Sequence, residues 1–239
     1  MNDKNYVSIM DGTMLPGRSL MDYVYDPINN KYLAPAQAIR NFNTPEYYKN
    51  NTPYTRIVAI VDTGVLPDHP FIKNLLIESI DFTGEGIADL NGHGTIVTLL
   101  AILPTTPIIN VKVVSADGKG SPESLINGLN WLKRKKKTFG ENIKLYVNVS
   151  LGTYSKKWGI FDCRGRCRIC KAAEELTQED VTIYAAAGNT PGKTSCPAKL
   201  ALTTKNERIL AVGDENWEKS GKFNRSANSN PGPFRDINW

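Results

Sequence analysis

The stretch at residues 57–64, IVAIVDTG, decides the fold class. Its apolar part predicts a strand that is buried on both faces, as in parallel sheets. Asp62 ends the apolar run and precedes Thr63 and Gly64, so we expect it at the carboxyl edge of the strand. Open α/β sheets place their sites at this edge. An Asp at a strand end is also a common turn residue, so Asp62 alone does not decide its role.

The rest of the chain repeats this pattern. From Arg56 onward, short apolar runs alternate with amphipathic stretches, which indicates a parallel sheet covered on both faces by helices. The predicted strands are residues 57–61, 109–114, 143–149, 181–187 and 208–212, and the predicted helices are 93–102, 122–136 and 166–176. We expect one three-layer α/β domain at 55–239 with a mainly parallel sheet. Residues 1–54, rich in Asn, Pro and Tyr, predict an irregular N-terminal extension with a short helix at 34–39.

Two further motifs carry polar residues that could act with Asp62. NGHGT at 91–95 places His93 in the first turn of a predicted helix, between glycines that allow close backbone approach. AAAGN at 185–189 places Asn189 after another strand, where small residues leave room for a substrate. Alone, each is more simply interpreted as a structural His or a turn Asn. Their order after Asp62 changes that interpretation.

Together the three motifs resemble those of the subtilisin-like serine proteases (the subtilases, peptidase family S8). That family uses Asp, His and Ser in this chain order, with an Asn side chain in the oxyanion hole. The resemblance implies a subtilisin-like fold, with Asp62 orienting the histidine, His93 as general acid/base and Asn189 in the oxyanion hole. Ile96 stands where the family commonly has a second histidine, which is not part of the triad.

The same resemblance predicts where a polypeptide substrate binds. The residues assigned to this site are Ser150, Leu151, Gly152, Ala187 and Gly188. The first three match the family's substrate-binding strand, on which an extended peptide pairs as an added strand. The loop at 115–121 resembles the opposite rim of the groove.

The nucleophile is the part of the triad without a match. The family carries it in a Gly-Thr-Ser segment that has no counterpart in the 239 residues. We therefore expect an incomplete C-terminus, a serine supplied by a downstream segment or a second chain, and no activity of this chain alone. Ser195 lies in a loop that the family uses for the specificity pocket, and Ser121 belongs to the rim loop. Neither is predicted as the nucleophile.

Four cysteines form a separate motif. Cys163, Cys167 and Cys170 have the spacing C-x₃-C-x₂-C, and the fold is expected to bring Cys196 near them. A structural Cys₄ zinc site, one or two disulfides, and ordinary buried thiols all fit this pattern. Basic neighbours favour thiolates, and the absence of a secretory signal disfavours disulfides. No cofactor is predicted for catalysis, and the sequence gives no indication about calcium.

Charge and hydropathy limit the partners. The formal net charge is +5, and part of the excess lies in the run KRKKK at 133–137. At a helix C-terminus such a run is more simply a solvated end than a nucleic-acid patch. No stretch approaches the roughly 18 apolar residues of a membrane span. We expect no nucleic acid and no membrane as partners, and a cytoplasmic location, with secretion left open.

The function that these observations predict is serine endopeptidase of the subtilisin type. Two alternatives stay open. One is a catalytically inactive relative that keeps the groove at Ser150 to bind an extended peptide. The other is a metal-stabilised interaction module in which the cysteine cluster is the functional part.

Overall fold

The computed structural model describes residues 7–9, 24–26, 31–33, 55–101, 106–153, 156–157, 161–189, 193–204, 206–213, 215–217 and 223–225. At its centre is a six-stranded sheet in the order β13-β12-β8-β4-β6-β5, and all its pairings are parallel. The strands are β4 (Arg56–Asp62), β5 (Leu76–Asp81), β6 (Ile108–Lys112), β8 (Lys144–Val149), β12 (Val181–Ala186) and β13 (Ile209–Val212). The predicted parallel α/β fold is confirmed.

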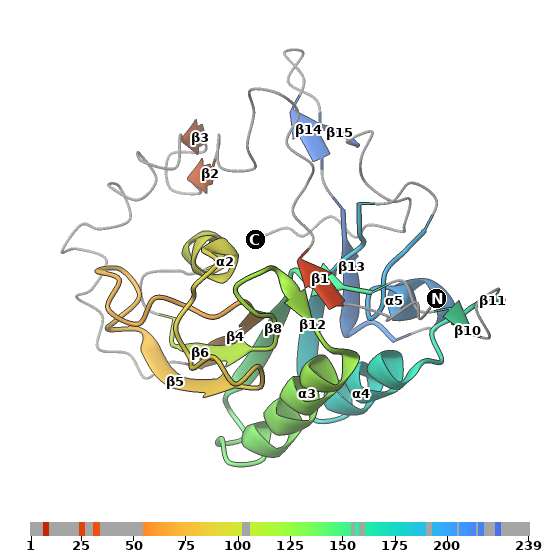
Figure 1. Cartoon of the computed structure of the whole chain (residues 1–239), viewed down its shortest axis with the longest axis horizontal. Helices are drawn as coiled ribbons and strands as arrows, with labels where there is room; N and C mark the ends of the chain where they lie inside the picture. The colour runs from red at the N-terminus through yellow and green to blue at the C-terminus, as the bar shows by residue number, and fades with distance from the viewer. Residues whose placement is uncertain are drawn as a thin grey trace.

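Helices cover both faces of this sheet (Figure 1). They are α2 (His93–Ala101) on one face, α3 (Pro122–Lys136) and α4 (Arg168–Thr177) together on the other, and the short α5 (Lys199–Thr203). Strand β4 shows why its sequence is apolar throughout. Ala59 and Val61 enter the large core beneath α3 and α4, whereas Ile60 enters a second core on the opposite face. Because both faces are dry, the alternation typical of half-exposed strands is lost.

The basic end of α3 is less solvated than expected. Lys133 forms an ion pair with Glu175 at 3.1 Å, and Lys137 forms one with Glu179 at 3.2 Å, both across to α4 and the turn after it. Lys136 is buried, with 9% of its surface exposed. The run therefore helps to hold α3 against α4, in addition to its favourable place at the negative end of a helix dipole.

A small antiparallel sheet stands beside the main one. Its order is β7-β1-β9, with β1 at Val7–Ile9, β7 at Lys119–Gly120 and β9 at Leu151–Gly152. Three strand pairs complete the described elements: β2 (Val24–Asp26) with β3 (Lys31–Leu33), β10 (Lys156–Lys157) with β11 (Phe161–Asp162), and β14 (Glu215–Trp217) with β15 (Phe223–Arg225). Strands β1, β2 and β3 lie in the extension that was predicted to be irregular. The helix predicted at 34–39 lies outside the described residues.

Within the described part of the chain, no helix combines the length and the apolar character that crossing a membrane requires.

Candidate active site

Asp62 and His93 meet at the carboxyl edge of the sheet. Asp62 is the last residue of β4 and His93 the first of α2, and His93 Nδ1 lies 2.7 Å from Asp62 Oδ1. The same oxygen accepts a hydrogen bond from the Thr63 amide at 2.7 Å. Asp62 is fully buried, whereas 14% of the His93 side chain is exposed. The pair therefore joins a buried carboxylate to an imidazole ring that is partly exposed to solvent.

Burial raises the pKa of Asp62 above its ordinary value, although the hydrogen bond and the charge of His93 oppose this effect. Among the described residues, Asp62 Oδ2 has no hydrogen-bond partner. A carboxylate kept dry in this way is stabilised most when the His93 ring carries a proton, because the imidazolium is then its nearest positive charge. The contact thus orients the His93 ring through Nδ1, which is the arrangement that proton transfer at Nε2 requires.

Asp89 organises the segment that leads into His93, and the sequence analysis did not single it out. Its Oδ1 accepts hydrogen bonds from Thr63 Oγ1 at 2.9 Å and from the Gly92 amide at 2.8 Å. Its Oδ2 accepts from both the amide and the hydroxyl of Thr95, at 2.8 and 2.6 Å. Burial raises the pKa of Asp89, but the hydrogen bonds from Thr95, Gly92 and Thr63 outweigh it and hold that pKa below its ordinary value. One carboxylate thus ties the end of β4 to the start of α2.

Gly94 allows α2 to begin against β4. A Cβ atom at this position would overlap the carbonyl oxygen of Gly64 and lie 3.1 Å from both Asp62 Cβ and Thr63 Oγ1. Gly64 itself has φ of +112°, a conformation that favours glycine. Gly94, one of the two glycines beside His93, is therefore required for the close approach of α2 to the end of β4.

The loop between β5 and α2 is anchored by Lys112, a second residue that the sequence did not reveal. Lys112 is the last residue of β6 and is fully buried. Its Nζ donates to the Ala88 carbonyl at 2.9 Å and forms an ion pair with Glu85 at 3.2 Å. Asn110 Nδ2 donates to the Ile87 carbonyl at 2.9 Å. A lysine inside an apolar strand was the available signal, since a buried charge needs a partner.

Asn189 follows β12 at the same sheet edge as Asp62. Ile60 of β4 and Tyr184 of β12 pair with the same residue of β8, so the two strands run level on either side of β8 and end at the same edge of the sheet. Ala187 is buried, with its amide bonded to the Val212 carbonyl and its own carbonyl accepting from the Ser195 amide. Gly188 has φ of +100° and turns the chain toward Asn189, which is partly exposed.

The segment assigned to peptide binding forms an edge with its own partner. Ser150 precedes β9, and its Oγ accepts from Asn148 Nδ2 at 2.7 Å. Strand β9, which comprises Leu151 and Gly152, pairs antiparallel with β1, and β1 pairs on its other side with β7. The segment 7–9 of this chain therefore lies as an added strand between the two predicted walls of the groove.

Ser195 and Ser121 have structural partners. Ser195 is fully buried, and its hydroxyl donates to the Ala186 carbonyl at 2.7 Å. Ser121 is the N-cap of α3, where its Oγ accepts from the Ser124 amide at 2.9 Å. These contacts support the view that neither serine is the nucleophile.

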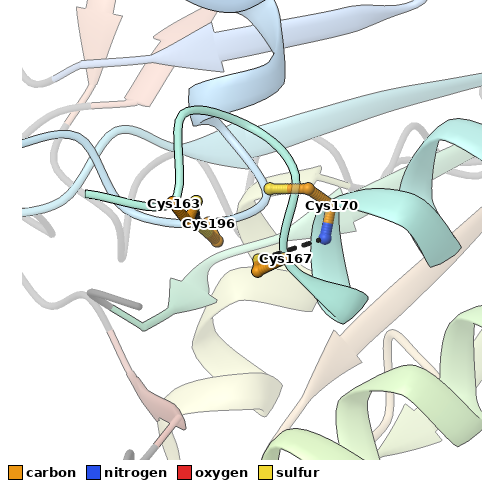
Figure 2. A group of neighbouring side chains, drawn as sticks. All are labelled: Cys163, Cys167, Cys170 and Cys196. Atoms are coloured by element: carbon orange, nitrogen blue, oxygen red, sulfur yellow. Dashed lines mark hydrogen bonds between the residues drawn. The ribbon is translucent and has the colours of Figure 1, made fainter. Parts of the chain in front are cut away.

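The four cysteines come together away from this dyad, as the sequence analysis expected for Cys196. Their Sγ atoms all lie within 4.8 Å of one another, and none forms a disulfide (Figure 2). Cys163, Cys170 and Cys196 are buried, and Cys167 is partly buried.

A doubly covered parallel sheet with an Asp–His pair at its carboxyl edge fits the subtilisin type of α/β serine protease. The chain belongs to the subtilase family (peptidase S8), whose sequence model matches residues 55–235.

Similar proteins agree with this assignment. The subtilase-type proteinase RRT12 of Saccharomyces cerevisiae is 31% identical over 188 residues, which are 74% of this chain and 34% of that protein. The major intracellular serine protease of Bacillus subtilis is 26% identical over 74% of this chain and 56% of its own length. The crystal structure of a cold-adapted subtilisin-like serine proteinase matches with a TM-score of 0.57 and 23% identity, over 80% of this chain and 66% of that one. The chain thus spans about a third to two thirds of the length of these relatives.

Proposed function

We propose that this protein is the part of a serine endopeptidase that supplies the general base, the oxyanion asparagine and the peptide groove. The observation that carries the proposal is the 2.7 Å contact between His93 Nδ1 and Asp62 Oδ1 at the carboxyl edge of the sheet. Asp62 fixes the tautomer and orientation of the ring, so that Nε2 takes the proton of a serine hydroxyl as that oxygen attacks the peptide carbonyl. The protonated ring then gives this proton to the leaving amine.

The nucleophilic serine comes, in this proposal, from outside the 239 residues. Support comes from the absence of a Gly-Thr-Ser sequence in the chain and from the structural hydrogen bonds of Ser195 and Ser121. A downstream segment or a second chain then completes the triad. Asn189 stabilises the oxyanion of the tetrahedral intermediate. Loss of one such donor lowers turnover by about 10²- to 10³-fold, a value measured for subtilisin itself.

A polypeptide substrate binds as an added strand between β7 and β9. The pairing of β1 with both strands supports this, because it shows that their facing edges accept an extended backbone. In this proposal residues 1–54 form an extension to the peptidase domain, and its strand β1 has to leave before a substrate enters. Main-chain hydrogen bonds supply affinity there, and Ser150, Ala187 and Gly188 border the position of the scissile bond.

A second candidate function is peptide binding without hydrolysis. The observation that favours it is that the groove strands and their pairing with β1 are complete without a nucleophile. In that case Asp62 and His93 are retained from a catalytic ancestor, and the chain acts by holding an extended segment.

Peptide hydrolysis by the completed protein separates the two functions. A segment that carries Gly-Thr-Ser and its following helix, taken from a related subtilase, is joined to the chain or added in trans. We expect turnover of an unstructured polypeptide, with loss of nearly all of it in His93→Ala, since removing this base from subtilisin lowers turnover about 10⁶-fold. Stable association of the segment without turnover, together with tight peptide binding, would support the non-catalytic function.

A further inference from the structure

The four cysteines converge from three parts of the chain (Figure 2). Cys163 follows β11, Cys167 and Cys170 lie at the start of α4, and Cys196 precedes α5. The Sγ atoms of Cys163 and Cys196 lie 3.0 Å apart, and no pair of the four exceeds 4.8 Å. The cluster lies in the same core as β8 and β12, so its sulfur atoms are largely shielded from water.

The backbone around the cluster is shaped to aim the sulfur atoms inward. Arg164 and Gly165 have φ of 47° and 75°, and the Arg166 amide donates to the Cys163 carbonyl at 2.9 Å, which closes a tight turn. A Cβ atom at Gly165 would overlap Thr203 Oγ1, so this turn packs closely on α5. Cys167 is the N-cap of α4, and its Sγ accepts from the Cys170 amide at 3.5 Å. The N-terminus of a helix stabilises an anionic sulfur.

The distances select one ligand among those that four cysteines could hold. Zinc binds thiolates at about 2.3 Å in a tetrahedron, which sets each sulfur pair about 3.8 Å apart. The observed separations lie on both sides of this value. A disulfide brings two sulfurs to about 2 Å, whereas all four cysteines are unpaired and the Sγ atoms of Cys163 and Cys196 are 3.0 Å apart. A four-iron cluster places each thiolate on a different iron and so spaces the sulfurs more widely.

We propose that Cys163, Cys167, Cys170 and Cys196 bind one zinc ion. All four positions of the tetrahedron are filled by protein, so the ion is structural and activates no water. Four thiolates around Zn²⁺ carry a net charge of −2. The exposed cations Arg164, Arg166 and Lys171 are next to these cysteines in the sequence, and Cys167 caps the N-terminus of α4, so both are placed to offset that charge.

The zinc ion also supports the wall of the peptide groove, and this second step rests on the proposed function. The amide of Cys196 donates to the Thr153 carbonyl at 2.8 Å, and the amide of Thr153 donates back at 3.2 Å. Thr153 directly follows β9, the strand on which a peptide is proposed to pair. The neighbouring Ser195 amide donates to Ala187, beside the oxyanion residue Asn189. Fixing Cys196 thus fixes both sides of the substrate site.

Zinc content of the full chain tests the site. Purified protein should carry one zinc per chain, and Cys170→Ser and Cys196→Ser should lose it, whereas Lys73→Ala, which changes an exposed lysine between β4 and β5, should keep it. Replacement by Co²⁺ in the unmodified chain should give the sulfur-to-metal charge-transfer bands of a tetrahedral thiolate site. This spectrum decides the question even where a cysteine variant fails to fold.

Two results would overturn the zinc site. One is four titratable thiols with no stoichiometric zinc and no cobalt spectrum. The other is a Cys163–Cys196 disulfide found by mass spectrometry under non-reducing conditions.

The role of the zinc ion in the groove has its own test. Chelation should weaken the binding of an extended peptide at least several-fold. Unchanged peptide affinity after zinc removal would contradict the role of the zinc site in the groove, although the zinc site itself would stand. A chain that carries zinc and binds no peptide would contradict the proposed function instead.

Discussion

At the scale of single residues, Asp89 positions the segment that carries His93. Its two oxygens hold Thr63, Gly92 and Thr95, and these residues flank the two members of the dyad. Because Asp89 is 5% exposed, each hydrogen bond to its charge is sheltered from competition by water. Hydrogen bonds to charged groups contribute about 1.5–3 kcal/mol each.

Asp89→Asn should therefore lower the free energy of unfolding by about 3 kcal/mol, because an NH₂ group would face the Thr95 amide and remove two acceptor contacts. Urea unfolding at neutral pH measures this change. Asp117→Asn is the control, since 60% of the Asp117 side chain is exposed and its loss should change stability by less than about 0.5 kcal/mol. Equal stability of the Asp89 and Asp117 variants would show that the hydrogen-bond hub is not formed.

The same carboxylate predicts a pH dependence. The pKa of Asp89 is lower in the folded state than the value of about 3.9 for an unfolded chain, so its stabilisation is complete above that value. It is lost as the pH falls through the folded-state pKa, because protonation then removes the charge. The difference in unfolding free energy between the parent and Asp89→Asn should shrink on acidification below about pH 4. A difference that does not vary between pH 7 and pH 3 would contradict this account.

Gly94→Ala should disturb the dyad directly. Its Cβ would meet the Gly64 carbonyl, so α2 must shift away from β4, with a cost of about 1–3 kcal/mol typical of overpacking. In the parent, the NMR signal of the proton on His93 Nδ1 should have the downfield shift of a hydrogen-bonded proton. In Gly94→Ala we expect that shift to be lost. Gly140→Ala has open space around its Cβ and should be neutral or slightly stabilising. An unchanged His93 signal in Gly94→Ala would contradict the packing argument.

Residues with a motif were predictable, and residues that act through tertiary hydrogen bonds were not. Asp62 and His93 stand at element ends, where strand and helix patterns place them without knowledge of the fold. Asp89 and Lys112 act on backbone groups of a loop that has no periodic pattern, and their roles emerge only when β4, β6 and α2 are packed. Gly152 illustrates the same limit, because a Cβ there would lie 2.8 Å from Ser195 Oγ and 2.9 Å from the Cys196 carbonyl. A larger residue at position 152 would therefore push β9 and the segment at Ser195 and Cys196 apart.

At the scale of elements, β1 is the feature with the most direct consequence. Its residues Ser8 and Ile9 pair with Gly152 and Leu151, and Val7 and Ser8 pair with Gly120 and Lys119. Any peptide that uses these edges must displace it. The apparent affinity for a peptide is then reduced by the fraction of molecules in which the edges are covered.

Ser8→Pro should raise the affinity for an extended peptide, because proline removes a backbone donor from the strand and weakens β1. We expect an increase of roughly tenfold in a fluorescence-anisotropy titration if β1 covers the groove in most molecules. Ser8→Ala keeps the amide and is the matched control. The same affinity in both variants would show that peptides bind elsewhere or that β1 does not compete.

The long elements were predicted well, and the short ones were missed. Strands β4, β6, β8, β12 and β13 and helices α2, α3 and α4 match their predicted ranges within a few residues. The strands have apolar runs, and α3 and α4 each bury an apolar face. Strand β5, whose residues are partly buried or, at Ile77, exposed, gave no such signal. Strands β1, β7 and β9 comprise two or three residues each, and they form through pairing with distant segments rather than through local preference.

At the scale of the whole molecule, the Asp62–His93 pair and the cysteine cluster are two separate sites on one sheet. Asp62 ends β4 and His93 begins α2, whereas the cysteines lie after β11, at the start of α4 and before α5. Backbone hydrogen bonds join Thr153 to Cys196 and Ala187 to Ser195, and so connect the cysteine cluster to the segments that follow β9 and β12. The family and the parallel fold were predictable from the three motifs. The place of the groove between the two sites depends on contacts between segments far apart in sequence.

Covalent labelling by a fluorophosphonate tests most directly whether this dyad activates a serine from outside the 239 residues. The chain alone should take up no label. After addition of the Gly-Thr-Ser segment, one label per complex should appear on that serine, and both His93→Ala and Asp62→Ala should abolish it. Stoichiometric labelling of the 239-residue chain alone, at Ser195 or Ser121, would contradict the account.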